Sequence, residues 1–352
     1  MGKSLNMPLG STIMLEDTHI SLAHGNGGRY MRDLIEAVFV KHLNQNTSGV
    51  CLDTESDAVL LKDICGPIYT TVDGFAVHPL EFPGGDIGSL AVHGTINDLS
   101  VAGAIPKYLT LSAILEEGLE ISVLDRVVQS FAAAARDAGV SVVAGDTKVV
   151  PRGNGGGIYF SVSGIGTVDD GLHLSMKHVL PGDVILVSGT VGDHGTAVML
   201  AREAFGLQGD LPSDSASVLP LARCLSGIAG VHFLRDPTRG GLATVAQEIS
   251  MATGLTIRLE EQYIPVSDQV SSVCEILGYD PLYLACEGRC VAIVQADIAE
   301  QVLSLWQATA EGKNSAIIGT VESGKQEVLL ETAMGGVRRL EELEDDPLPR
   351  IC

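Results

Sequence analysis

Hydrophobic positions recur along this chain with two periods, and each period predicts a set of elements. Apolar residues three and four positions apart, or in runs of helical length, predict helices over residues 29–43, 87–102, 123–138 and 242–252. Shorter β-branched runs predict strands over residues 68–72, 107–116, 140–144, 158–165 and 183–188. Glycine and aspartate follow several of these runs, so we expect the strands to end in polar turns.

A change in composition over residues 167–179 divides the chain into two halves of similar pattern. The length of 352 residues is greater than one ordinary hydrophobic core supports. Aromatic residues make up only 4% of the chain, so Ala, Val, Leu and Ile must build the cores, which favours α/β or α+β packing. We expect a leader over 1–18, domains over 19–168 and 169–334, and a tail over 335–352.

Charge and composition exclude several classes of function. A net charge of −22 is the wrong sign for binding a nucleic-acid backbone. No apolar run approaches the ~18 residues of a transmembrane helix, and the first residues lack the apolar region of a signal peptide. The seven cysteines are scattered without metal-binding spacing, which indicates a reducing cytoplasm and no structural zinc.

The chain ends in a cysteine, Cys352, preceded by a segment rich in Asp, Glu and proline. This composition predicts a solvated tail, and its roughly 17 residues reach up to about 55 Å when extended. Such a tail can carry a thiol from a partner's active site to a pocket on its own chain. The alternative is a free cysteine on a frayed end without function.

Acidic residues stand near the predicted ends of elements in the first half, and carboxylates at strand ends meet on one rim of a sheet. The four that we single out as candidate magnesium ligands are Asp57, Asp73, Asp98 and Asp146. Mg²⁺ prefers hard oxygen ligands and shares its shell with phosphates and water. The alternative for each single residue is a turn or helix-capping role.

Two glycine-containing segments precede predicted helices and are candidate anion sites, because backbone N–H groups and the helix N-terminus attract negative charge. Their chemistry-bearing residues are His24, Gly25, Gly27 and Gly28 in the first, and Asp236, Thr238, Arg239 and Gly240 in the second. Ordinary tight turns remain the alternative. Neither segment is a P-loop.

Three further residues carry possible chemistry. Lys148 and Glu287 each lie beside an apolar strand, where a general base can be tuned by its surroundings, although each can also be a surface charge. His194 lies in Gly192-Asp193-His194-Gly195, which predicts a helix entry. A core or capping role for His194 competes with catalysis.

In this order the motifs resemble one family, over roughly residues 20–352. They are His24-Gly25-x-Gly27-Gly28, Thr71-x-Asp73, Asn97-Asp98-Leu99-x3-Gly103-Ala104-x-Pro106, Gly145-Asp146-Thr147, Asp236-x-Thr238-x-Gly240-Gly241 and the terminal Pro349-Arg350-Ile351-Cys352. The sequence is similar to the HypE family of hydrogenase-maturation carbamoyl dehydratases. That family belongs to the ATP-dependent superfamily of aminoimidazole ribonucleotide synthetase and selenophosphate synthetase.

The resemblance implies a two-domain PurM-like α+β fold whose N-terminal sheet dimerises into a barrel. ATP and Mg²⁺ would lie in a cleft between the halves, completed by the second protomer of a homodimer. Motif matching adds Asn97 and Thr147 to the nucleotide-binding residues proposed above.

The resemblance also implies a reaction. A carbamoyltransferase, HypF, places a carbamoyl group on the sulfur of Cys352, and ATP-dependent dehydration converts it to a thiocyanate. Glu287 and Lys148 would remove the nitrogen protons, and the cyanide would pass to iron on a HypC–HypD complex. The alternatives are a synthetase acting on a free small substrate and a non-catalytic scaffold that docks through its tail.

Overall fold

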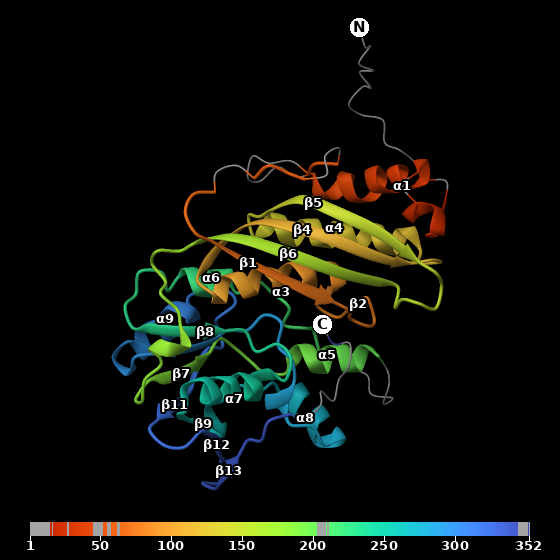
Figure 1. Ribbon diagram of the computed structural model, residues 1–352. Coiled ribbons are helices and arrows are strands. Elements are labelled where there is room, and N and C mark those ends of the chain that lie inside the picture. Colours follow the sequence, from red (N-terminus) through yellow and green to blue (C-terminus); the bar gives the residue numbers. More distant parts are fainter. Residues whose placement is uncertain are drawn as a thin grey trace.

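The computed structural model describes residues 15, 17–26, 28–44, 52–54, 58–61, 64–202, 209, 211–343 and 351. They form two stacked α+β units (Figure 1). The strands of the N-terminal unit are β1 (Ile68–Phe75), β4 (Ala104–Glu116), β5 (Ser141–Val150) and β6 (Ile158–Val168). They form one sheet in the order β1-β6-β4-β5, so β1 and β5 are its two edges.

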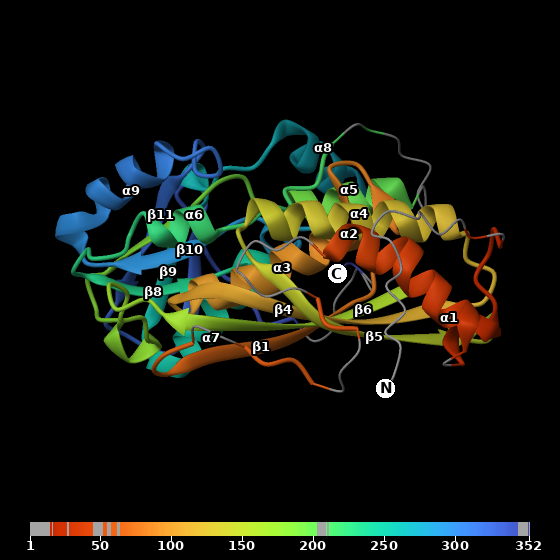
Figure 2. The same cartoon turned by 90° about the horizontal axis from the view of Figure 1, so that it is seen from above.

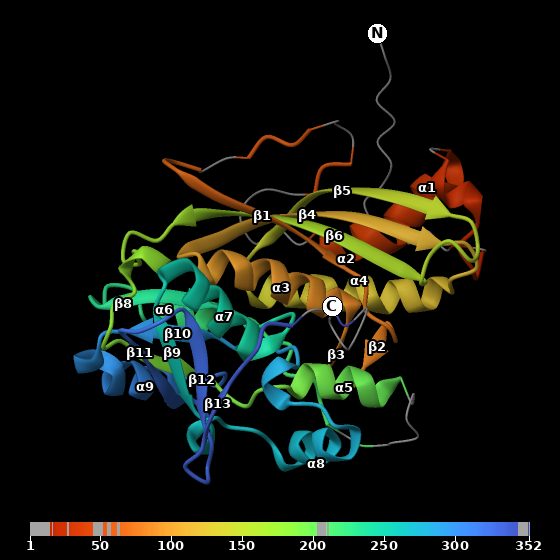
Figure 3. The same ribbon diagram turned by 60° about the horizontal axis from the view of Figure 1, so that its bottom comes forward.

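Two long helices, α3 (Ile87–Val101) and α4 (Ile121–Asp137), cover one face of this sheet and lie between it and the C-terminal unit (Figure 3). The Asp86 carboxylate caps α3 by accepting hydrogen bonds from the N–H groups of Gly88 and Ser89. A side chain at Gly88 would meet the carbonyl oxygen of Val127, so glycine permits close packing of α3 on α4. The helix α1 (Arg29–Leu34) continues through a π-helical turn, Ile35–Val40, into α2 (Lys41–Leu43) beside α4 (Figure 2).

The C-terminal unit is built on a seven-stranded sheet. Its strands are β7 (Val184–Val187), β8 (Val231–Arg235), β9 (Thr256–Glu260), β10 (Val291–Val294), β11 (Ala316–Glu322), β12 (Glu327–Glu331) and β13 (Val337–Arg339). They lie in the order β13-β12-β9-β11-β7-β10-β8, with β9 and β12 parallel and the other pairs antiparallel. The strand β10, which lies between β7 and the edge strand β8, is buried at every position, as its uninterrupted apolar sequence predicts.

The remaining elements join the two units. The helices of the C-terminal unit are α5 (Asp193–Ala201), α6 (Leu219–Arg223), α7 (Gly241–Thr253), α8 (Asp268–Leu277) and α9 (Ala299–Gln307). A small hairpin of β2 (Glu81–Phe82) and β3 (Gly85–Asp86) reaches from the N-terminal unit to α5. One hydrophobic cluster runs from α3 and α4 into α5 and α8, through Val198 and Val270, so the two units share a continuous core.

The predicted helices and most predicted strands are confirmed, within a few residues at their ends. Two predicted strand ends are wrong. The strand β1 continues through Asp73 and Gly74 to Phe75, and β5 continues through Asp146 and Lys148 to Val150. Pairing with β6 and β4 provides partners for this backbone and outweighs the local turn preference of Gly and Asp.

Within the described ranges, no helix is both long and apolar enough to span a bilayer.

Candidate active site

Three carboxylates come together where β1, α3 and the end of β8 meet. The hydroxyl of Thr71 on β1 donates a 2.8 Å hydrogen bond to Asp98 on α3. Asp73 lies two residues further along β1 and faces α3 at Gly94, one helical turn before Asp98. Asp236 follows β8 and is buried. The packing of α3 between the units therefore joins residues from three elements.

The negative charges of Asp73, Asp98 and Asp236 repel one another. Burial, and then repulsion from Asp98, raises the pKa of Asp236 to about 7, although Arg235 opposes the shift. Burial also raises the pKa of Asp98, and Asp73 adds to this effect. Carboxylates that repel one another in this way suit a hard cation. Nevertheless, no three His, Cys, Asp or Glu side chains in the described part of the chain already form a metal-binding group.

Asp146 lies away from this cluster within one chain. Register pairs place Asp73 beside Val162, Val162 beside Leu111, and Leu111 beside Gly145. Three strand spacings, about 14 Å, therefore separate Asp73 from the Gly145-Asp146 position. The expectation that these carboxylates share one rim does not hold within a single protomer, because they lie on opposite edges of the sheet. Asp57 is outside the described residues.

A second group of candidate residues gathers at the β5 edge. Gly25 lies so close to β5 that a side chain there would be 2.9 Å from Val149. His24 is fully buried, and its Nδ1 accepts from the backbone N–H of Ser21 at 3.0 Å. Lys148 is exposed and lies 3.6 Å from the carboxylate of Asp146. Thr147, between them, is buried.

The other residues of the first glycine segment lie at the start of α1. Gly28 takes the position immediately before this helix. A side chain at Gly28 would meet nothing within 4 Å, so its backbone is open to a ligand. Gly27 is outside the described residues.

The second glycine segment leads from β8 into α7. Gly240 has φ +71°, a left-handed conformation that glycine adopts without strain, and a side chain there would collide with Thr244. Thr238 is partly buried and Arg239 is exposed. Their backbone leads into the N-terminus of α7, where a negative ligand is favoured.

Glu287 is the most unusual carboxylate of the site. It is 2% exposed, and its Oε1 has no hydrogen-bond partner. Burial raises its pKa well above the usual range, and Asp214, Asp236 and Asp73 raise it further, while Arg239 opposes them. Glu287 therefore belongs electrostatically to the same site as the three-carboxylate cluster. A buried carboxyl held in this state fits a general base of raised pKa.

The side chain of Asn97, on α3, fastens the two units together beside Glu287. Its Nδ2 donates to the carbonyl oxygens of Ala216 and Glu287 at 3.0 and 3.2 Å. Its Oδ1 accepts from the N–H of Val218 at 2.8 Å. These backbone contacts occupy the amide, so in this structure Asn97 positions the Glu287 loop.

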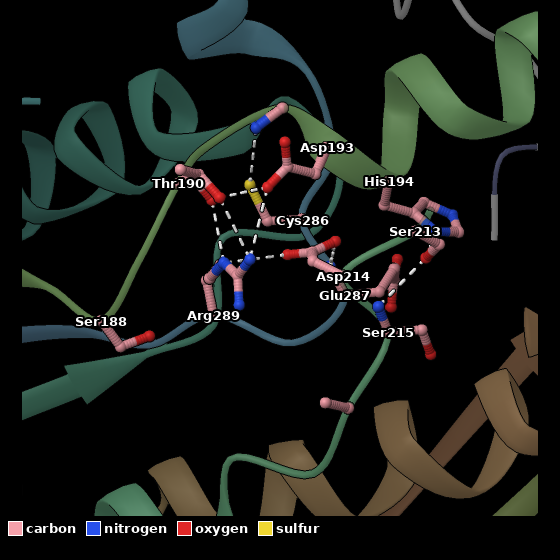
Figure 4. Close-up of polar contacts among 12 residues, drawn as sticks. Ser188, Thr190, Asp193, His194, Ser213, Asp214, Ser215, Cys286, Glu287 and Arg289 are labelled. Atoms are coloured by element: carbon pink, nitrogen blue, oxygen red, sulfur yellow. Dashed lines mark hydrogen bonds and ion pairs between the residues drawn. The ribbon is translucent and has the colours of Figure 1, made fainter. Parts of the chain in front are cut away.

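A polar network surrounds Glu287 on the other side (Figure 4). The Asp214 carboxylate accepts from the Glu287 N–H at 3.1 Å and lies 3.4 Å from Arg289. Arg289 also pairs with Asp193 at 3.3 Å and donates to the carbonyl oxygen of Thr190 at 2.8 Å. Asp214 and Arg289 are not among the candidate residues proposed from the sequence. Arg289 stands two residues after Glu287, but no motif marks Asp214.

The end of the tail reaches the same region. Ile351 is 3% exposed and belongs to the hydrophobic cluster shared by the two units. Its carbonyl oxygen accepts a 2.8 Å hydrogen bond from Nε2 of His194, whose Nδ1 accepts from Ser213 at 2.8 Å. This residue of the expected solvated tail is therefore docked. Cys352 and residues 344–350 are outside the described residues.

Similarity to known proteins defines the class first. Residues 55–168 match the N-terminal domain of AIR synthase related proteins, and residues 181–331 match the C-terminal domain of the same proteins. The fold is shared by thiamine monophosphate kinase from Aquifex aeolicus, with a TM-score of 0.57 at 17% identity over 75% of this chain and 88% of that one. This is the two-domain PurM-like class expected from the motifs.

Closer relatives define the family. Carbamoyl dehydratase HypE of Azotobacter vinelandii is 45% identical over 344 residues, 97% of this chain and 100% of that protein. A crystal structure of hydrogenase maturation protein HypE in complex with ATP has a TM-score of 0.87 at 42% identity, over 94% of this chain and 99% of that one. HypE in a HypE–HypF complex has a TM-score of 0.76 at 43% identity, over 88% and 99%. The chain belongs to the HypE family of carbamoyl dehydratases.

Proposed function

We propose that this protein is an ATP-dependent carbamoyl dehydratase that converts an S-carbamoyl group on its own Cys352 into a thiocyanate, which supplies cyanide to iron during NiFe-hydrogenase maturation. One observation supports this most strongly. The unpartnered, buried carboxylate of Glu287 and the docking contact of Ile351 are linked through adjacent residues of one loop, Ser213 and Asp214. The same segment therefore contacts Glu287, the proposed base, and, through His194, Ile351, the residue before the substrate thiol.

The reaction removes one oxygen and two protons from S–C(=O)NH₂. Bound ATP supplies a phosphoryl group that lets the oxygen leave as phosphate, with ADP as the second product. The nitrogen gives up both protons and forms the triple bond of S–C≡N. Glu287 in its ionised form accepts one of these protons through its free Oε1, because a raised pKa makes the carboxylate a stronger base, and the other proton leaves on the phosphate.

The acidic cluster fits a magnesium site for the nucleotide. Asp73, Asp98 and Asp236 provide hard oxygen donors whose mutual repulsion a cation would relieve. Mg²⁺ commonly completes its shell with phosphate oxygens and water, so a full set of protein ligands is not required. Thr238, Arg239 and Gly240 at the start of α7 would contact phosphates.

Lys148 fits a different role from Glu287. Its ammonium group is exposed and paired with Asp146 at 3.6 Å, which leaves it accessible to phosphate or a developing negative charge. We therefore assign Glu287 as the principal base. Lys148 stabilises charge, together with His24, Gly25 and Thr147 at the β5 edge, Gly28 at the start of α1, and Gly27, which is outside the described residues.

A homodimer brings the two groups of residues together. In one chain they lie at opposite edges, β1 and β5. Pairing β1 of one protomer with β5 of its partner would close an eight-stranded barrel and complete each site from two chains. Exposed apolar side chains on β1, Ile68 at 50% and Val72 at 67%, support a covered sheet in the assembly.

The tail connects this site to other proteins. The structure of a HypE–HypF complex, whose HypE chain is similar to this one, supports HypF as the carbamoyltransferase that modifies Cys352. Release of Ile351 from His194 would let the thiocyanate reach a HypC–HypD iron scaffold. We place all of these steps in the cytoplasm, where thiols remain reduced.

The function is tested by the intact mass of the protein after incubation with the carbamoyltransferase, carbamoyl phosphate and ATP. We expect carbamoylation followed by loss of one water, both on the C-terminal peptide. The Cys352→Ala variant should show neither change. Carbamoylation of that variant, or ATP turnover that proceeds equally without Cys352, would identify another acceptor or a free-substrate synthetase. Absence of ATP turnover in the parent protein would indicate a scaffold.

A further inference from the structure

Ile351, the residue before Cys352, makes a hydrogen bond that takes no part in the proposed proton transfer. The backbone carbonyl of Ile351 accepts a hydrogen bond from His194 Nε2 at 2.8 Å. The two residues are separated by 157 positions in the chain, and both are buried, His194 completely. Because this buried carbonyl is paired with a buried donor, the contact defines a specific binding site for the end of the tail, which we call the seat of the tail.

The orientation of the His194 ring follows from its two partners. A carbonyl oxygen only accepts hydrogen bonds, so Nε2 carries the proton and Nδ1 accepts from the hydroxyl of Ser213. Burial lowers the pKa of His194, although Asp214 opposes the shift, and the imidazole remains neutral. Phe82 packs edge-on against the ring at a centroid distance of 5.6 Å. The donor is thus fixed toward Ile351.

The segment that orients His194 also orients the base. The Ser213 oxygen accepts from the N–H of Ser215 at 3.0 Å, which shapes the loop. Asp214, between them, accepts from the N–H of Glu287 at 3.1 Å. Figure 4 shows Ser213 and Asp214 on this segment, with His194 and Glu287 beside it on other parts of the chain. Any movement of the loop would displace both the seat of the tail and the carboxylate.

We propose that His194 is a positioning residue that docks the tail by binding the main-chain carbonyl of Ile351, so that carbamoylated Cys352 is presented to Glu287. This rests on the proposed function of the same site. Recognition of a peptide carbonyl together with a buried isoleucine is independent of the chemical state of the thiol. The seat therefore binds the tail both before and after modification of Cys352. Binding restricts the otherwise extended tail to one position relative to the active site.

The test measures docking and chemistry separately in the full chain. Docking is measured as the alkylation rate of Cys352, read by mass spectrometry of the C-terminal peptide with exposed Cys65 as internal reference. His194→Phe keeps a ring but removes the donor, so alkylation should accelerate by about 3- to 10-fold, the effect of one lost hydrogen bond. His194→Gln retains an N–H donor and should remain closer to the parent. Ile351→Ala, which keeps the backbone carbonyl but removes the buried side chain, should also accelerate alkylation.

Dehydration of pre-carbamoylated protein should slow in His194→Phe by a similar factor, and His194→Gln should restore part of the rate. Carbamoylation by the partner enzyme and nucleotide affinity should not change in either variant. Unchanged alkylation of Cys352 in folded His194→Phe, or in Ile351→Ala if the former does not fold, overturns the docking role. If alkylation responds as expected but no form of the protein dehydrates, the docking role stands and the proposed function fails.

Discussion

The side-chain amide of Asn97 donates a 3.2 Å hydrogen bond to the backbone carbonyl of Glu287, across the junction between the two units. The same amide bonds to Ala216 and Val218, so one residue of α3 fixes both segments that border the site. The position of the base in the C-terminal unit is therefore set by a helix of the N-terminal unit.

We expect Asn97→Ala to destabilise the protein by about 2–4 kcal/mol, because it removes the side-chain partner of the Val218 N–H and of the Ala216 carbonyl, and one of the two donors to the Glu287 carbonyl. It should also slow dehydration, since Glu287 loses a support of its loop. Denaturant unfolding and the dehydration rate of pre-carbamoylated protein measure the two effects. Asn97→Asp, which keeps the acceptor for Val218 but loses the donors, serves as a comparison. Normal stability together with normal rate in Asn97→Ala would contradict the assigned contacts.

Glu287→Gln should stop dehydration while leaving carbamoylation of Cys352 intact, because the second step alone needs the base. A general base contributes about 10²–10⁴-fold to a rate. Lys148→Ala should have the smaller effect, since Lys148 is exposed and paired with Asp146. The measurement is thiocyanate formation on pre-carbamoylated protein. A Glu287→Gln variant within a few-fold of the parent rate would remove Glu287 from the mechanism.

Asp73→Asn and Asp146→Asn should each weaken Mg–ATP binding in calorimetry. Asp73→Asn removes a hard oxygen donor from the cluster with Asp98 and Asp236. Asp146→Asn removes a charge from the β5 edge, and its effect should depend on dimer formation. Asp137, an exposed carboxylate at the end of α4, provides a matched control as Asp137→Asn. Equal nucleotide affinity for all three variants would move the metal site elsewhere.

Asp236→Asn should stabilise the protein at neutral to alkaline pH in the absence of nucleotide and magnesium. The folded pKa of Asp236 is raised from 3.8 to about 7, so the parent loses stability as the pH rises between these values. At about 1.4 kcal/mol for each pKa unit, the loss is on the order of 4 kcal/mol. Thermal unfolding of parent and variant should therefore diverge from about pH 4 to pH 8. Parallel curves across this range would show that Asp236 carries no such cost.

The sequence predicted the elements well because its apolar periods are long and regular, as in the stretch that forms α4. It also singled out Asp73 and Asp98 as candidate metal ligands, and the elements that carry them, β1 and α3, are in contact. It placed Asp146 on the same rim because local turn chemistry suggested strand ends, whereas the actual sheet order puts β5 at the far edge. Strand order depends on long-range packing that a local pattern does not carry.

The contacts of Ser213 and Asp214 could not be predicted. Asp214 is 73 positions from Glu287 along the chain and lies in a segment without regular periodicity. The burial of Ile351 could not be predicted either, because the polar composition of the residues before it predicts a solvated tail. Both interactions join segments that lie far apart in the chain, which a local pattern does not reveal.

The position of β1 and β5 at opposite edges has a genetic consequence if each site is completed by two chains. In a mixed dimer of an Asp73→Asn chain and an Asp146→Asn chain, one site would contain both substitutions. The other site would contain neither. Two inactive alleles expressed in one cell should then complement each other, with about a quarter of all sites functional when the chains associate at random. Alleles altered at Asp73 and Glu287, which belong to the same group within one chain, should not.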